Sequence, residues 1–364
     1  MQYILHVDEE TNVTLNWFLR FLCQHVLKER QVCLISDRHK GILNAIRLQR
    51  LWQPLYAVHR LCLRHVRSNF NTKFHNTHLK KLCWDAGSTP QKRKFTKIMA
   101  EIERIDAKAA KYLREIGKEE LWTLAYDGGY RHGMLTTNIS ESFNNAIKGV
   151  RNLPIRAAVE LVFTRIVKMF QDKKEDALHC QHPLPKRPWK IYREAEIKGR
   201  KHSAVQFSLS DGIFNILTHI NESGKGGNTR TVCMKERSCT CGKWMITRIP
   251  CSHTMLACRM MSINPITLVG QEYHKNLYLK TCSGQFHPIQ HEDYWPGQPF
   301  SLVGDMTRMR PPHQGRTSTA RIHNEMDERE DDAPRCRTCH LPGHNRKNCP
   351  RLSSNQSRLS YNQS

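Results

Sequence analysis

The sequence predicts an α/β fold with a mostly parallel sheet, followed by small zinc-bound modules. Two observations lead to this prediction. Over residues 3–58, short apolar runs alternate with amphipathic helical segments, which is the βαβ order of a parallel sheet. Further along the chain, two clusters of cysteine and histidine have the spacing of zinc ligands. We therefore expect an N-terminal α/β region and C-terminal metal modules.

Three short apolar runs predict the strands of the α/β region. They cover residues 3–7, 32–35 and 55–58. The second is a continuous run of Val, Cys, Leu and Ile, as expected for a parallel strand buried on both faces. Asp37 follows it, at the sheet edge where parallel α/β folds place their sites.

Helical periodicity fills the segments between these strands. Apolar residues from Leu15 to Leu27 recur at i, i+3, i+4 and i+7, which predicts a helix capped by Thr14 or Asn12. A second helix is predicted over residues 41–51. The stretch from Leu63 to Trp122 is helical, basic and polar, and helical character returns over residues 138–174.

The C-terminal half contains a proline-rich break and two short strands before the first metal cluster. Pro183–Pro188 predicts a linker, and residues 205–208 and 231–234 predict strands. The predicted order is an α/β region over 1–182 with a helical insertion over about 63–130, a linker over 183–202, a zinc-finger region over 203–280, a disordered linker over 300–334, a zinc knuckle over 335–350 and a disordered tail over 351–364.

Composition favours a nucleic-acid partner. Lys and Arg number 57 against 33 Asp and Glu, a net charge of +24. Such a charge favours a polyanion, and nucleic acid ahead of an anionic membrane surface. No apolar run approaches the ~20 residues of a membrane span and no signal peptide is evident. Six of the 14 cysteines lie in the two clusters, which favours a reducing compartment. We expect a nuclear protein.

Both clusters offer a tetrahedral Zn²⁺ shell. The first, Cys239-x-Cys241-x9-Cys251-x-His253, matches the SWIM pattern CxC…CxH. The second, Cys336-x2-Cys339-x4-His344-x4-Cys349, has the compact spacing of a zinc knuckle. Scattered buried cysteines are the alternative for either cluster. The interpretation favoured by the spacing is two Zn²⁺ sites.

Basic residues beside the ligands are candidate phosphate contacts. They are Lys243 and Arg248 at the first cluster, and Arg337, Arg346 and Lys347 at the second. Trp244 either stacks on a base or packs the finger, and packing is favoured because so small a module needs an apolar anchor. The knuckle has no aromatic residue between its ligands, so we expect backbone contacts that depend strongly on salt.

Together with the two clusters, three further segments resemble a Mutator-like element transposase. They are the strand end ISDRHKGILNAI, the stretch HRLCLRH and the segment TTNISESFNNAIKGVRNLPI. All occur in the order shown by that family, and the resemblance extends to about Pro299. Far-red-response transcription regulators derived from such transposases share much of this layout.

The resemblance implies a partial RNase H-like core with a DDE triad that holds Mg²⁺ or Mn²⁺. Asp37 corresponds to the second acidic residue and Glu141 to the third. Cys62 and His65 correspond to the family's CxxH motif, with a structural or metal role that His75 and His78 could complete. A homo-oligomer formed through this region is also possible.

One departure weakens the catalytic expectation. In the family the first catalytic Asp lies in a strand before the segment that corresponds to residues 4–7, and this chain begins at that later strand. We therefore predict a zinc-binding, nucleic-acid-associating protein that does not catalyse strand transfer as given. Two alternatives remain open. One is a DDE transposase whose first Asp lies upstream, and the other is a transcription regulator or SWIM-mediated protein-interaction module.

Overall fold

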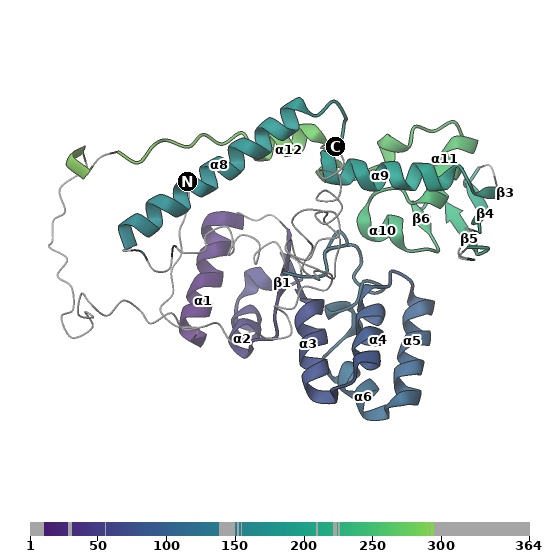
Figure 1. Ribbon diagram of the computed structural model, residues 1–364, viewed down its shortest axis with the longest axis horizontal. Coiled ribbons are helices and arrows are strands. Elements are labelled where there is room, and N and C mark those ends of the chain that lie inside the picture. Colours follow the sequence, from purple (N-terminus) through teal and green to yellow (C-terminus); the bar gives the residue numbers. More distant parts are fainter. Residues whose placement is uncertain are drawn as a thin grey trace, which may run out of the picture. The chain divides into compact units, whose positions relative to one another are not determined.

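The computed structural model describes residues 11–27, 31–54, 56–137, 150, 153, 155–208, 210–220, 224, 226–290 and 292–294 (Figure 1). The longer helices are α1 (Asn12–Phe21), α2 (Lys40–Leu48), α3 (Leu63–Phe74), α4 (Thr77–Ser88), α5 (Lys92–Ile105), α6 (Ala107–Glu115), α8 (Ile155–His179), α9 (Lys186–Gly199), α10 (Lys243–Thr247), α11 (Ser252–Met260) and α12 (Lys275–Thr281). The strands are β1 (Val32–Ser36), β2 (Ala57–Leu61), β3 (Ser203–Ser208), β4 (Ile213–Leu217), β5 (Thr229–Cys233) and β6 (Ser238–Cys239). Short turns are η1 (Leu22–Leu27, π), η2 (Arg50–Trp52), η3 (Glu119–Leu121), η5 (Pro265–Leu268), η6 (Gln271–Tyr273) and η7 (Glu292–Tyr294).

The α/β region contains a βαβ unit made of β1, α2 and β2. These strands pair in parallel, from Val32↔Ala57 to Ser36↔Leu61, and α2 connects them. α1 packs against α2, and both cover a small apolar cluster in which Trp52 is nearly fully buried. The predicted parallel sheet is confirmed for these two strands. An RNase H-like core is not established by the described residues, and the predicted strand over residues 3–7 lies outside them.

Three local predictions in this region need correction. The cap of α1 is Thr11, whose hydroxyl accepts the amide of Thr14 in a reciprocal capping box. The second helix ends at Leu48, and a turn of η2 follows. This turn moves the next strand to Ala57–Leu61, because the amides of Tyr56 and Ala57 bond back to the carbonyl of Gln53.

Helices α3 to α6 form a bundle, which we call the helical unit (Figure 1). Consecutive helices pack against one another, and apolar side chains from all four make one core. Phe70, Ile102 and Leu113 are completely buried in it. The segment predicted to be helical is therefore helical, and it has its own core.

A buried ionic cluster joins the segment that follows η3 to β2. Asp127 is fully buried and accepts hydrogen bonds from Arg60 Nε at 2.9 Å and Arg131 Nε at 3.0 Å. Arg131 is also fully buried and donates to the carbonyl oxygens of Leu61 and Leu121. Each nitrogen of the two guanidinium groups thus donates to at least one acceptor, as a buried charge requires.

The stretch expected to be a linker contains a helix. Residues 186–199 form α9, which packs along α11. Pro188 is the third residue of α9, where the backbone has no intrahelical acceptor for an amide, so a proline does not break the helix there. Gly199 lies at the crossing, where a Cβ would come within 2.6 Å of the carbonyl oxygen of Ser252. α9 is thus packed onto the region that follows it.

Strands β3 to β6 and helices α10 and α11 form the zinc module, residues 203–260. Its sheet has the order β3-β4-β5-β6 and is antiparallel throughout. Phe214, Ile216 and Val232 lie on one face and are completely buried. The two predicted strands are confirmed as β3 and β5. The sequence analysis missed β4, although Ile213–Leu217 has the alternating burial of a strand packed on one face.

Several predictions concern residues outside this description. They are the linker over 300–334, the zinc knuckle, the tail over 351–364 and the helical residues 138–149. Among the described residues, no helix is both long and apolar enough to cross a bilayer.

Candidate metal centre

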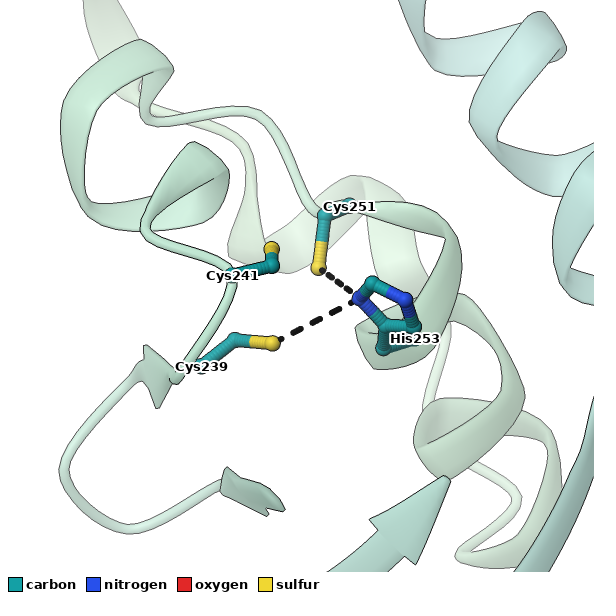
Figure 2. Close-up of side chains that lie close together, drawn as sticks. All are labelled: Cys239, Cys241, Cys251 and His253. Atoms are coloured by element: carbon teal, nitrogen blue, oxygen red, sulfur yellow. Dashed lines mark hydrogen bonds between the residues drawn. The ribbon is translucent and has the colours of Figure 1, made fainter. Parts of the chain in front are cut away.

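Four side chains of the zinc module converge on one point (Figure 2). Cys239 ends β6 and Cys241 lies in the turn after it. Cys251 is the N-cap residue of α11, and His253 lies in the first turn of that helix. Figure 2 shows the three sulfur atoms and the imidazole facing one another across a small gap. A hairpin and a helix start therefore supply two ligands each, as the CxC…CxH spacing predicts.

The turn between the first two ligands depends on Gly242. Its φ is +75°, in the left-handed region, and its amide donates to the carbonyl oxygen of Cys239 at 2.8 Å. A Cβ on Gly242 would overlap the carbonyl oxygen of Pro90. Glycine is thus required here by both the backbone conformation and the close approach of Pro90.

The distances fit a tetrahedral zinc ion. Nδ1 of His253 lies 3.6 Å from Sγ of Cys239 and 3.6 Å from Sγ of Cys251. All four ligand atoms lie within 4.8 Å of one another. With Zn–S near 2.3 Å and Zn–N near 2.0–2.1 Å, tetrahedral geometry separates sulfur from nitrogen by about 3.6 Å. The residues fit Zn²⁺, and Nδ1 is the nitrogen that would bind it.

Burial makes the centre a closed, structural type of site. Cys239 and Cys241 are each 2% exposed, Cys251 is 5% and His253 is 8% exposed. Four protein ligands leave no position for a water or substrate, unlike the three-ligand centres of zinc enzymes. The role of this centre is therefore structural: the bound metal would stabilise the fold of the zinc module.

The thiols share their protons in the absence of a cation. Hydrogen bonds to Cys241 and Cys251, and burial, raise the pKa of Cys239. The pKa of Cys241 is also raised, to about 12: the bond with Cys239 lowers it, but the bond with Cys251 and burial outweigh this effect. Hydrogen bonds from Cys239 and Cys241 hold the pKa of Cys251 well below its usual range. Hydrogen bonds thus couple the ionisation of the three ligand thiols, and Cys251 is the most easily ionised of them.

The ligands form part of the module's apolar core. Trp244 is 3% exposed and lies in one cluster with the ligand cysteines and with Phe214 and Ile216. The predicted packing role of Trp244 is confirmed, and base stacking is excluded by its burial in this conformation. Metal binding and core packing therefore depend on each other in this module.

The predicted basic residues of the first cluster lie at the two ends of α10. Lys243 is its first residue and is exposed. Arg248 follows its last residue, is also exposed, and has Nε 3.8 Å from Glu272 Oε1. Arg337, Arg346 and Lys347 lie outside the described residues. So do the ligands of the second cluster: Cys336, Cys339, His344 and Cys349.

Asp37 lies just after β1, as predicted, and its carboxylate accepts a hydrogen bond. Oδ1 accepts the backbone amide of His39 at 3.0 Å, just before α2 begins. Glu141 lies outside the described residues. Within the described part of the chain, Asp37 belongs to no group of three or more potential metal ligands.

Cys62 and His65 lie at the start of α3. Cys62 is completely buried, and its sulfur accepts hydrogen bonds from the amide of Thr137 at 3.4 Å and its hydroxyl at 3.5 Å. Burial raises the pKa of Cys62, but the hydrogen bonds from His65 and Thr137 outweigh it and lower the pKa to about 7. His75 and His78 do not join them in a metal-ligand group among the described residues. His78 instead lies 3.8 Å from Glu101.

Comparison with known proteins agrees with the metal centre. Residues 230–261 match the SWIM zinc finger. The matched segment runs from β5 to the end of α11 and includes all four ligands. No curated protein and no solved structure matches the chain. The chain contains a SWIM zinc finger with a Cys₃His centre suited to Zn²⁺.

Proposed function

We propose that this chain is a zinc-dependent nucleic-acid-binding protein derived from a Mutator-like element transposase. The observation that carries the proposal is a buried Cys₃His centre in a chain of net charge +24. Zinc modules of this size take much of their folding free energy from the metal. A strongly positive chain favours a polyanionic partner. DNA is the proposed partner ahead of RNA, and the nucleus is the proposed location.

In this proposal the chain binds nucleic acid, and Asp37 takes no part in strand transfer. A carboxylate that helps to hold two divalent ions needs further acidic ligands beside it. Among the described residues, Asp37 belongs to no group of metal ligands, and its carboxylate accepts the amide of His39, a local bond that Asp side chains commonly make in turns. Mg²⁺ or Mn²⁺, together with Glu141, belongs to the alternative of a DDE transposase.

Binding of the full chain to labelled duplex DNA, titrated with salt, tests the proposal. We expect the affinity to fall steeply as salt rises, because phosphate contacts release counterions. A chelator should weaken binding, and added Zn²⁺ should restore it. Affinity that responds to neither salt nor zinc would sink the nucleic-acid function and favour the protein-interaction alternative.

Metal analysis of the same protein tests the second predicted site. We propose two Zn²⁺ ions per chain, one at the described centre and one at the knuckle ligands Cys336, Cys339, His344 and Cys349. Mutation of Cys336 and Cys339 to serine should reduce two zinc ions to one. A single zinc ion in the unmutated chain would remove the knuckle from the proposal. Sedimentation of this sample also tests the proposed homo-oligomer.

A further inference from the structure

The first turn of α5 concentrates positive charge. Lys92, Arg93 and Lys94 are its first three residues, and Lys97 lies one turn further on. All four side chains are exposed, and the turn contains no acidic residue and no side-chain cap at Gln91. The N-terminus of a helix is already the positive end of its dipole, so cations there repel it and one another. This arrangement destabilises the isolated protein and favours an anionic partner.

Other cations of the helical unit are neutralised. Arg114 forms a two-bond ion pair with Glu103, with distances of 2.9 and 2.7 Å, and Lys111 lies 3.8 Å from Glu115. By contrast, no carboxylate of the described residues lies within ion-pair distance of Lys92, Arg93, Lys94 or Lys97. The ammonium of Lys92 lies over the ring face of Tyr126, 5.0 Å from its centroid. The charge at the start of α5 is therefore not compensated within the described residues.

The zinc module adds a fifth cation to this surface. Pro90, two residues before Lys92, touches Gly242 so closely that a Cβ there would overlap the Pro90 carbonyl oxygen. Gly242 directly precedes Lys243, which is exposed. On the other side of α10, a Cβ on Gly129 would lie 2.6 Å from the carbonyl oxygen of Met245. The contact of Gly242 with Pro90 places the start of α10 beside the start of α5, and the contact of Gly129 packs the middle of α10 against the segment after η3.

We propose that Lys92, Arg93, Lys94, Lys97 and Lys243 form one surface, the basic surface, that binds the phosphate backbone of duplex DNA. This inference rests on the proposed function and names the site that performs it. Exposed lysine and arginine side chains suit phosphate oxygens, which accept hydrogen bonds from them. No aromatic side chain of the surface is free to stack on a base. Binding here is thus independent of base sequence.

The test measures DNA affinity of the zinc-loaded full chain over a range of salt concentrations. The variant K92Q/R93Q/K94Q removes three charges from the basic surface, and K243Q removes the fifth cation. The matched control, K168Q/K173Q/K174Q, removes three exposed charges from α8. Each phosphate contact contributes about −0.9 to the slope of log affinity against log salt, so the α5 variant should flatten the slope by about 3. We expect its affinity to fall at least tenfold, and the control to change much less.

The possible failures are distinguishable. An unmutated chain that does not bind DNA overturns the proposed function. An unmutated chain that binds, with the α5 variant and the α8 control equal in affinity and slope, overturns only the basic surface. Vesicles of anionic phospholipid serve as the competing polyanion. Binding to them through these residues, without DNA binding, would also overturn the proposal. Circular dichroism and zinc content confirm that each variant is folded.

A different observation concerns the wall of the metal centre. The ring of His202, which directly precedes β3, stacks on the ring of the ligand His253 with centroids 5.4 Å apart and planes 19° apart. Its Nδ1 accepts the backbone amide of His219 at 3.2 Å. Nε2 therefore carries the proton and donates to Ser252 Oγ at 3.0 Å. Both nitrogen atoms are engaged, so the ring of His202 is held in one orientation.

We infer that His202 is a positioning residue for the zinc ligand. Nδ1 of His253 must point at the three sulfur atoms, and a ring stacked on its face opposes rotation away from them. The bond to the hydroxyl of Ser252 ties the same ring to the residue between Cys251 and His253. Groups in the second coordination layer typically change metal affinity 10- to 100-fold when removed. His202 thus connects the β3–β4 sheet to the centre without binding the metal.

Substitutions that separate the two contacts of His202 test this inference. H202F keeps a stacking ring and loses both hydrogen bonds, while H202Q keeps a hydrogen-bonding group and loses the ring. We expect H202A to weaken Zn²⁺ binding 10- to 100-fold, measured by competition with a chromophoric chelator, and H202F and H202Q each to recover part of the loss. The control H219A removes an exposed neighbouring ring while keeping the backbone amide.

Co²⁺ substitution supplies a readout that reports ligand geometry. Removal of a positioning ring should shift or broaden the visible d–d bands of the tetrahedral Co²⁺ site in H202A and leave those of H219A unchanged. Zn²⁺ affinity and Co²⁺ bands of H202A equal to those of the unmutated chain would overturn the assignment. So would equal losses of affinity in H202A and H219A.

Discussion

The helical unit and the zinc module show two ways of stabilising a fold in one chain. The helical unit buries aliphatic and aromatic side chains from four helices, with Phe70, Ile102 and Leu113 at zero exposure. In the zinc module, three of the buried cluster residues are the ligands Cys239, Cys241 and Cys251. Apolar burial stabilises the first region without help, at about 25 cal/mol per Å². The second has too small an apolar core and depends on the metal that its cysteines bind.

The two regions also differ in how they keep buried polar groups. Beside the helical unit, Asp127 is buried between Arg60 of β2 and Arg131, and its one carboxylate pairs with both guanidinium groups within the polypeptide. The zinc module buries thiols that need an external cation before all three ionise. The buried charges beside the helical unit are therefore paired within the polypeptide, while the buried thiols of the zinc module need bound Zn²⁺.

Removal of zinc should produce the largest difference in stability between the zinc module and the helical unit. Structural zinc supplies about 10–16 kcal/mol of apparent binding free energy in zinc-finger peptides. With a chelator, amides of β5 and α11 should therefore exchange with solvent at rates near those of unfolded chain. Amides of α3 and α5 should keep their protection. Hydrogen–deuterium exchange with mass spectrometry measures both in one sample, and added Zn²⁺ should restore the pattern. Equal loss in both regions would contradict the separation.

A substitution at Asp127 should destabilise the helical unit and leave the zinc module unchanged. Asp127→Asn leaves two buried guanidinium groups without a counter-charge, which costs about 3–5 kcal/mol. Denaturant unfolding followed through α3–α6 should show this loss, while zinc affinity of the module stays unchanged. The exposed pair of Glu103 with Arg114 provides the control: Glu103→Gln should change stability little, because water replaces the partner. An unaffected unfolding midpoint in Asp127→Asn would show that the buried cluster does not stabilise the helical unit.

Acidity should loosen the zinc module before the helical unit. The pKa values of Cys239 and Cys241 are raised in the metal-free state, so both thiols carry protons near neutral pH. Zinc requires thiolates, and its binding therefore releases about two protons. Affinity should rise with pH and fall up to about 100-fold for each unit of acidification, a change of about 2.7 kcal/mol. Chelator competition at several pH values measures it, and a pH-independent affinity would be inconsistent with three ionised ligands.

The smallest effect is expected at the turn between the ligands. Gly242→Ala forces a side chain into the left-handed region and toward the carbonyl oxygen of Pro90, at a cost of about 1–3 kcal/mol. The unfolding temperature of the zinc module should fall slightly more than that of the helical unit. Gly224→Ala is the matched control, because that glycine also has a positive φ, of +72°, but has no atom within 4 Å of an added Cβ. Equal effects of both substitutions would show that the contact of Gly242 with Pro90 does not contribute to the loss of stability.

Local patterns predicted the features that lie close together in the sequence. The SWIM ligands span residues 239–253, and the turn and the helix start that hold them are encoded within that stretch. The strand before Asp37 and the helices after Leu63 also followed from periodicity. The predicted linker over 183–202 contains the helix α9 at Lys186–Gly199, which the proline-rich pattern did not predict, because a proline is tolerated in the first turn of a helix. Strand β4 was missed because its five residues form only a short alternating run.

The sequence by itself determined the identity and order of the zinc ligands, the net charge and the alternation of strands and helices. These depend on residue type and short spacings, which are visible without a fold. The tertiary structure alone decided which distant groups meet: Arg60 with Asp127, 67 residues apart, His202 with Ser252, 50 residues apart, and Pro90 with Gly242. Such contacts follow from how separate helices and strands pack, and no local periodicity encodes them.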